Sequence, residues 1–250
     1  MLTDRDKEVL AHFSTLIVSF SAGKDSLSCL LWALETNKPL RVIMTDTGNE
    51  PPDGWDYIKY VERTLGAKVE IYQRELDGHT RNFEYFVRHR QMWPLRGRCL
   101  VSSSTKRDDF KWYLKETQAP LDALIILGQR RSESKRRREL PDFSPVIRSG
   151  RACYRPILDW SIDDVMSYAA SKNIQVHPAY AKGRKRVGCV WCVNSSPDDL
   201  VRDEELYPER CAELRVLRKS IGLQSTPERA RQFSMFDQVP MCQYEAVHCE

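Results

Sequence analysis

Short apolar runs alternate along most of this chain with segments whose apolar residues recur every three or four positions. Short apolar runs bounded by turn residues predict buried strands, and the wider spacing predicts helices with one apolar face. The runs predict strands at Leu16–Phe20, Leu40–Met44, Lys68–Tyr72 and Ala123–Leu127. The periodic segments predict helices at Ser26–Glu35, Trp55–Leu65, Asn82–His89, Thr105–Thr117 and Ile162–Ser171.

The order of these elements predicts the fold class. Strands separated by helices favour an α/β fold, with a doubly wound, mostly parallel sheet and helices on both faces. The alternation fades after about residue 150, and residues 174–250 are rich in Pro, Cys, Arg and Trp. We therefore predict an α/β domain over residues 1–173 and a loop-rich, cysteine-containing cap over 174–250. Ligands of such sheets bind beyond the carboxyl ends of the strands, so the segments that follow strands are the candidate site.

The composition argues against a membrane-spanning protein. Charged residues make up 30% of the chain and mean hydropathy is −0.54. No apolar run approaches the ~20 residues that cross a bilayer. The first eight residues lack the apolar stretch of a secretory signal, so we expect a cytoplasmic protein with no membrane partner. Eight cysteines in such a chain favour metal or redox chemistry over a disulfide framework. Nothing in the sequence indicates an oligomeric state.

The segment after the first predicted strand reads Ser19-Phe-Ser-Ala-Gly-Lys-Asp-Ser26 and predicts an anion site. A tight turn of small residues leads into a helix, so backbone N–H groups, the helix N-terminus and the Lys24 ammonium converge on one small volume. Gly23 permits close approach of a phosphate, and the serine hydroxyls can donate hydrogen bonds to it. Because Asp25 follows the lysine, the segment is not a Walker A loop. The alternative interpretation is a helix capped by an aspartate or serine side chain.

Two further polar segments follow predicted strands. Asp46-Thr-Gly48 follows the second strand, where a carboxylate can accept hydrogen bonds from an adenine amino group or a ribose, or hold a metal. Gly128, after the fourth strand, would let the chain approach a ligand. Arg130 and Arg137 beyond it can make forked contacts to phosphate or sulfate oxygens. For the first segment, a polar turn that caps the next helix is the alternative.

The net charge of +4 is too small to indicate nucleic-acid binding, but the cations are clustered. Basic residues crowd the ranges 130–138 and 182–186. They favour recognition of phosphates on a nucleotide, a sulfonucleotide or a nucleic-acid backbone such as DNA or tRNA. The alternative is solvated surface charge.

The three strand-end motifs, in this order, resemble those of the phosphoadenosine-phosphosulfate (PAPS) reductase family of the ATP-pyrophosphatase superfamily. Ala22 replaces the first glycine of that family's Ser-Gly-Gly-Lys-Asp-Ser loop, a change that matters only if the backbone there needs a positive φ. The segments Pro156-Ile-Leu-Asp-Trp160 and His177-Pro-Ala-Tyr180, followed by Arg-x-Gly-Cys-x-x-Cys192, also match family segments. The resemblance covers roughly residues 13–200. It implies an adenine nucleotide α-hydrolase-like fold.

The resemblance also implies what the site binds. The expected ligand is an adenine nucleotide, either ATP with Mg²⁺ or a sulfonucleotide of the PAPS or APS type. The implied catalytic residues are Lys24, Asp25, Lys106 and Arg130. The implied nucleotide-binding residues are Ser19, Ser21, Ala22, Gly23, Lys24, Asp25, Ser26, Asp46, Thr47, Gly48, Gly128, Arg130, Glu133 and Arg137.

Cys189-x-x-Cys192 can offer two thiolates to one metal centre. In cluster-bearing relatives, this pair and a Cys-Cys-x(5)-Lys segment hold a [4Fe-4S] cluster. Cys99 and Lys106 match that segment, but Leu100 replaces its second cysteine. A fourth ligand would therefore have to come from elsewhere in the chain.

Cys153 is the first candidate for that fourth ligand and Cys211 is the second. Three alternatives stay open: structural zinc on four thiolates, a three-cysteine cluster with an open iron, and a redox dithiol without metal. The C-terminal Glu-Cys-Gly-x-His nucleophile of assimilatory sulfonucleotide reductases is absent. Cys249, beside His248, is a weaker candidate for that role.

The resemblance implies two reaction routes. In the first, a thiol attacks the sulfate sulfur of a sulfonucleotide, and sulfite is released. In the second, ATP adenylates an acceptor with release of pyrophosphate before sulfur is inserted, as in related DNA phosphorothioation enzymes. Either route implies a reductant or sulfur-donor protein as partner. A non-catalytic nucleotide sensor or accessory subunit, with structural zinc, is the alternative of a different class.

Overall fold

A six-stranded sheet forms the centre of the computed structural model, which describes residues 2–95, 99, 102–147 and 149–223. The strands lie in the order β3-β2-β1-β6-β8-β7. Neighbouring strands are parallel except β7 and β8, which are antiparallel. The bounds are β1 Thr15–Ser19, β2 Leu40–Thr45, β3 Val69–Tyr72, β6 Ala123–Leu127, β7 Phe143–Ser144 and β8 Cys153–Tyr154. The predicted α/β class is confirmed.

The four predicted strands are present to within one residue at either end. The strands β1, β2 and β6 form because each is an apolar run that the sheet buries on both faces, as expected for central parallel strands, whereas β3 is an edge strand with exposed positions. The sequence does not predict β7, β8 or the separate hairpin of β4 (Glu75–Leu76) and β5 (His79–Thr80). A run of two residues is too short to carry a periodic signal.

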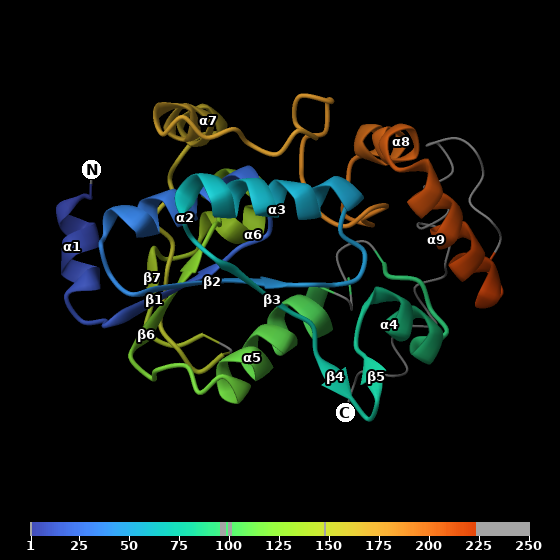
Figure 1. The fold of residues 1–250 in the computed structure, drawn as a ribbon, viewed down its shortest axis with the longest axis horizontal. Helices are drawn as coiled ribbons and strands as arrows, with labels where there is room; N and C mark the ends of the chain where they lie inside the picture. Colours follow the sequence, from blue (N-terminus) through green and yellow to red (C-terminus); the bar gives the residue numbers. More distant parts are fainter. Residues whose placement is uncertain (1, 96–98, 100–101, 148, 224–250) are drawn as a thin grey trace.

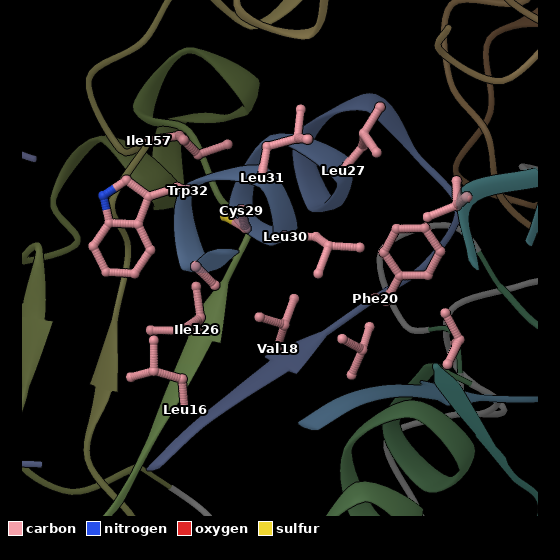
Figure 2. Close-up of a cluster of buried hydrophobic side chains, with 14 of the residues drawn as sticks. Leu16, Val18, Phe20, Leu27, Cys29, Leu30, Leu31, Trp32, Ile126 and Ile157 are labelled. Carbon is pink, nitrogen blue, oxygen red and sulfur yellow. The ribbon is translucent and has the colours of Figure 1, made fainter. Parts of the chain in front are cut away.

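Helices cover both faces of the sheet (Figure 1). On one face lie α2 (Lys24–Glu35), α3 (Pro52–Leu65) and α7 (Ile162–Ser171). Figure 2 shows leucines of α2 above sheet side chains that include Val18 and Ile126. On the other face, α5 (Phe110–Glu116) packs against Ile17, Ile43 and Ile125. A π-helical segment, Ser102–Asp109, leads into α5, so the helix predicted from Thr105 is divided between two helical types.

A second core lies beside the sheet. It joins α4 (Phe83–Arg90), from the predicted α/β part, to α8 (Pro197–Leu206) and α9 (Pro208–Ser220) of the predicted cap. Proline at the first turn of α8 and α9 suits a helix start, because the N–H it lacks has no partner there. The remaining helices are α1 (Asp4–Leu10) and α6 (Lys135–Arg138). Among the described helices, none has the length and apolarity needed to cross a membrane.

Candidate functional site at the carboxyl edge of the sheet

The loop between β1 and α2, residues 19–26, is held by its own side chains. The Ser26 hydroxyl donates to the Gly23 carbonyl at 2.9 Å and accepts the Ser21 N–H at 3.1 Å. The Ser21 hydroxyl oxygen lies 3.2 Å from the Ser26 hydroxyl oxygen. Ser26 therefore stabilises the loop from within, a role that the sequence does not predict. We call residues 19–26 the phosphate loop.

Ala22 has a φ of 57°, in the left-handed region. The replacement of the family's glycine by Ala22 therefore matters, because the backbone at this position needs a positive φ. An L-residue in this conformation costs about 1–2 kcal/mol. Ala22 is only 2% exposed. Burial of its methyl group therefore offsets about 0.8 kcal/mol of that cost. The turn leaves the N–H groups of Ala22 and Gly23 without an acceptor among the residues that the structure describes.

Two buried cations and one carboxylate lie at the start of α2. The Arg130 Nε is 2.5 Å from Asp25 Oδ1, and the Lys24 Nζ is 3.4 Å from Asp25 Oδ2. Lys24 and Arg130 are only 6% and 4% exposed. One carboxylate cannot balance two cations, so this cluster keeps a net positive charge in a partly desolvated place. Such a site favours an anion.

Gly128 permits the approach of β6 to the phosphate loop. A Cβ atom at this position would lie 2.8 Å from the Asp25 carbonyl carbon and oxygen and 2.9 Å from the Ser26 nitrogen. Those contacts are shorter than real Cβ contacts allow. The close approach is to the chain's own backbone, whereas the sequence predicts an approach to a ligand.

Glu133 and Arg137 form a pair of their own. The Glu133 carboxylate accepts the Arg130 backbone N–H at 2.7 Å and is ion-paired with the Arg137 guanidinium. Glu133 thus holds the backbone of Arg130, whose side chain reaches Asp25 and the Ser132 hydroxyl. Contacts of Arg137 with a phosphate stay a prediction.

A pocket lies between the phosphate loop and the segment after β2. Its lining comprises Ser19, Phe20, Ser21, Ala22, Met44, Thr45, Glu50, Pro51, Gly54, Lys106, Val187 and Gly188. The predicted residues among them are Ser19, Ser21, Ala22 and Lys106, and the other lining residues, which include Glu50, are additions to the predicted set. Glu50 lies four residues after Asp46 in a polar strand-end segment, which is the only sequence signal that could have pointed to it.

The segment Asp46–Glu50 is folded around its two carboxylates. Glu50 accepts the Thr47 N–H at 3.0 Å and the Thr47 hydroxyl at 2.8 Å. Asp46 accepts the Gly48 N–H at 2.6 Å. Burial raises the pKa of Asp46 to about 6, and the neighbouring Glu50 carboxylate adds to this rise. Gly48 has a φ of 71°, which suits glycine.

Three cysteines lie near the pocket, around Lys106. The sulfur of Cys189 raises the pKa of the Lys106 ammonium, and Glu50, Cys192 and Cys99 add to this rise against the effect of burial. Burial raises the pKa of Cys189 to about 12, with Lys106 opposing it. The Cys189 sulfur lies 3.5 Å from the Thr47 hydroxyl. The structure thus places three predicted cysteines and the predicted lysine at the same edge as the phosphate loop.

The candidate fourth ligands are buried in a strand and a helix, and Cys211 lies in the core cluster against which Cys99 packs. Cys153 is fully buried in β8, next to the edge strand β7, where it pairs with Ile125 of β6. Cys211 is fully buried in α9, and its thiol lies 3.5 Å from the Asp203 carbonyl. Within the described ranges, no group of three or more His, Cys, Asp or Glu side chains is arranged to hold a metal ion. Those residues do not build a four-thiolate cage, so we assign no step to a metal. Cys249 lies outside the described residues.

The Cys-x-x-Cys segment, residues 189–192, is held by distant residues. The Asn49 side chain donates to the Val190 carbonyl at 2.8 Å, and the Val190 N–H donates to the Asn49 carbonyl at 2.8 Å. The Trp191 N–H donates to Asp203 Oδ2 at 2.8 Å, and Trp191 has a φ of 54°. Asn49 and Asp203 therefore hold both residues between the two cysteines. We call residues 189–192 the thiol loop.

Many cations of the two basic clusters have internal partners. Arg130 and Arg137 pair with the carboxylates described above, and Arg131 pairs with Asp159. Arg184 is 3% exposed and lies 2.9 Å from Asp203. The exposed members of the clusters are Lys135, Arg136, Arg138, Lys182, Lys185 and Arg186. Each cluster therefore exposes fewer cations to solvent than the sequence predicts.

Comparison with known proteins gives the class. Residues 15–195 match the model of the phosphoadenosine phosphosulfate reductase domain. The chain belongs to this family.

Individual relatives are distant. An uncharacterized 37.8 kDa protein of Escherichia phage 186 is 26% identical, covering 83% of this chain and 75% of its own length. A phosphoadenosine 5'-phosphosulfate reductase of Buchnera aphidicola is 26% identical over 74% of this chain and 73% of its own. The crystal structure of the PAPS reductase from Candida auris superposes with a TM-score of 0.55 at 17% identity, covering 77% of this chain and 98% of that one. This last likeness supports the fold alone.

Proposed function

We propose that this chain binds an adenine nucleotide, ATP or a sulfonucleotide, in the pocket at the carboxyl edge of the sheet and uses it for sulfur transfer. The observation that carries the proposal is the pairing of Lys24 and Arg130 with Asp25 in the loop that lines that pocket, next to the Ala22 and Gly23 N–H groups, which have no acceptor among the described residues. Backbone donors and cations at a helix start form a site for phosphate. The cysteines across the pocket support sulfur chemistry.

The residues would divide the work as follows. The phosphate loop and Lys24 would neutralise the phosphates, and Arg130 would hold Asp25 in place beside them. Fixed donors of this kind stabilise charge that develops on a leaving group. The Lys106 ammonium, 3.9 Å from Glu50, would oppose the effect of burial on the Cys189 thiol and so ease its deprotonation. If ATP is the ligand, Mg²⁺ would accompany its phosphates.

The two routes break different bonds. On a sulfonucleotide, a thiolate would form a bond to the sulfate sulfur, and the bond from that sulfur to the bridging phosphate oxygen would break. The nucleotide would leave with that electron pair. A second thiolate would then attack the thiol sulfur of the resulting S-sulfonate, so that a disulfide forms and the S–S bond to the sulfonate breaks with release of sulfite. On ATP, an acceptor oxygen would attack the α-phosphorus and pyrophosphate would leave.

Equilibrium binding by calorimetry tests the proposal. Wild type, Lys24→Met and the control Lys38→Met are titrated with ATP and with PAPS. Lys38 donates to the Phe13 carbonyl, away from the site. We expect Lys24→Met to lose about 10- to 100-fold in affinity, as for a hydrogen bond to a charged group, and Lys38→Met to bind as wild type. Absence of wild-type binding at millimolar ligand would contradict the proposal.

Release of pyrophosphate or of sulfite then separates the routes, measured with and without DNA or tRNA under anaerobic conditions. Iron and acid-labile sulfide are assayed on the same preparation, because the cluster is implied by the resemblance. If the protein binds the nucleotide but releases neither pyrophosphate nor sulfite, with or without nucleic acid, the result would favour a non-catalytic nucleotide sensor.

A further inference from the structure

Tyr180 lies on a firmly held turn next to the phosphate loop. The Tyr180 N–H donates to the His177 carbonyl at 3.1 Å, and the Gly183 N–H donates to the Tyr180 carbonyl at 3.0 Å. At the end of the turn, Arg184 pairs with Asp203 of α8, and their side chains are 1% and 0% exposed. The turn therefore places the Tyr180 ring with little freedom.

The Tyr180 ring covers the start of α2. Its hydroxyl accepts the Lys24 backbone N–H at 3.1 Å, and the Lys24 Nζ lies 5.0 Å from the ring centroid. A Cβ atom at Gly23 would lie 3.5 Å from the hydroxyl oxygen, so the phenol is in van der Waals reach of the loop. The phenol thus lies beside the N–H groups that have no acceptor in the described structure.

The Tyr180 hydroxyl accepts hydrogen bonds in the described structure, and its own hydrogen is available to donate. Its oxygen accepts from Lys24, and the Val187 N–H also faces it. Among the residues that the structure describes, the hydrogen bonds of the Tyr180 hydroxyl are ones that it accepts, and none takes up the phenolic hydrogen. Burial raises the pKa of Tyr180 to about 12, so the hydroxyl keeps its proton at neutral pH. Hydrogen bonds accepted by a hydroxyl strengthen the one that it donates.

We infer that Tyr180 is a ligand-binding residue whose hydroxyl donates to an oxygen of a phosphoric anhydride held at the phosphate loop. The inference rests on the proposed function and adds to it a contact from the cap. The anion would take the N–H groups of Ala22 and Gly23, the Lys24 ammonium and the Tyr180 O–H. The N–H of Lys24, which already donates to Tyr180, is not offered to the ligand. A nucleotide that carries two adjoining acidic groups, whether a diphosphate or a phosphosulfate, presents enough oxygens for this set.

Calorimetric titration with inorganic pyrophosphate, and then with ATP, tests the inference. The variant is Tyr180→Phe, which keeps the ring over Lys24 and removes the hydroxyl. The matched control is Tyr57→Phe, which loses a hydroxyl bond to the Gln175 carbonyl in the same part of the molecule. We expect about 10-fold weaker binding to Tyr180→Phe and unchanged binding to Tyr57→Phe. Thermal melts of both variants report any general loss of stability.

The outcomes separate the two ideas. If wild type binds neither ligand, the proposed function fails and takes the inference with it. If wild type binds, Lys24→Met does not, and Tyr180→Phe equals wild type, the inference alone is overturned. Tighter binding by Tyr180→Phe also overturns it, because the phenol would then be a stand-in for the ligand that must be displaced. If Tyr180→Phe does not fold, titration of wild type with ATP while the tyrosine ultraviolet absorbance is followed decides, with Tyr57→Phe as reference. No change in the tyrosine signal on binding would overturn the inference.

Discussion

The phosphate loop and the thiol loop lie at the same edge of the sheet, but they differ in how much of their support is local. In the phosphate loop, the bonds among Ser21, Gly23 and Ser26 span at most five residues. Tyr180 and Arg130 add distant contacts to these local bonds. The thiol loop depends on Asn49, which is 141 residues from Val190, and on Asp203 in the next helix. A loop with local bonds can be predicted from its own motif. A loop with distant bonds depends on the whole fold.

The difference has a consequence for coupling. Asn49 belongs to the segment after β2 that lines the proposed nucleotide pocket, and Arg210 of α9 donates to its side-chain oxygen at 3.1 Å. The Arg210 guanidinium also donates to the Gly48 carbonyl at 2.8 Å. A change in the Asp46–Glu50 segment therefore reaches the thiol loop directly. The phosphate loop has no equivalent hydrogen bond to the thiol loop among the described residues.

The largest effect is expected from Gly128→Ala, because the added methyl would overlap the Asp25 backbone at 2.8 Å. Overpacking of this kind costs about 1–3 kcal/mol and here moves the phosphate loop itself. We expect at least about a 100-fold loss of nucleotide affinity, measured by calorimetry. Gly78→Ala is the control, because its φ of 74° makes alanine strained there while no atom lies within 4 Å of the added Cβ. Normal affinity in Gly128→Ala would show that the loop tolerates displacement.

Asn49→Ala tests the distant support of the thiol loop. It removes the donor to the Val190 carbonyl and the acceptor of Arg210, leaving buried polar groups unpaired. We expect a loss of about 2–3 kcal/mol in the free energy of unfolding and roughly 10-fold faster alkylation of Cys189 and Cys192, followed by mass spectrometry.

Ser161→Ala serves as the control for Asn49→Ala. It removes the cap of α7, away from the thiol loop, and should cost about 1 kcal/mol without changing alkylation. Equal alkylation rates in all three proteins would remove Asn49 as a support of the thiol loop.

A smaller effect is expected from Asp46→Asn, which lies between the two loops. The pKa of Asp46 is about 6 in the folded protein, against an ordinary value of 3.8 in the unfolded chain. Between these two pH values the folded state therefore binds more protons than the unfolded state. The free energy of unfolding of wild type therefore falls as pH rises from about 4 to about 6 and is level above that. Asn keeps the acceptor for Gly48 and carries no charge. We expect the variant to be more stable by about 1–2 kcal/mol at pH 8 and equal at pH 4, measured by urea unfolding. A pH-independent difference would mean that the carboxylate is not penalised in the folded protein.

The sequence predicts the core of the fold and one half of the site. Strand β6 and helix α7 have the predicted bounds, because a continuous apolar run and a capped amphipathic segment are strong local signals. Helices α8 and α9 are not predicted, because many of their residues are charged. Glu50 and Tyr180 lie in segments that the sequence singles out, but the sequence does not show which groups they meet, because folding brings their partners to them. Cys153 is a candidate ligand because it has no other explanation and precedes the Pro-Ile-Leu-Asp-Trp segment, and the structure buries it in β8 beside Ile125.

The amino-acid sequence alone determines that this is an α/β chain with a phosphate loop after its first strand, because both follow from short-range patterns of apolar and small residues. It also determines the family, through the order of three strand-end motifs. Only the tertiary structure decides which groups meet across the pocket. Tyr180 reaches Lys24 over 156 positions of the chain, and Asn49 reaches Val190 over 141. Contacts at such separations arise from the packing of the cap against the sheet, and no local pattern encodes them.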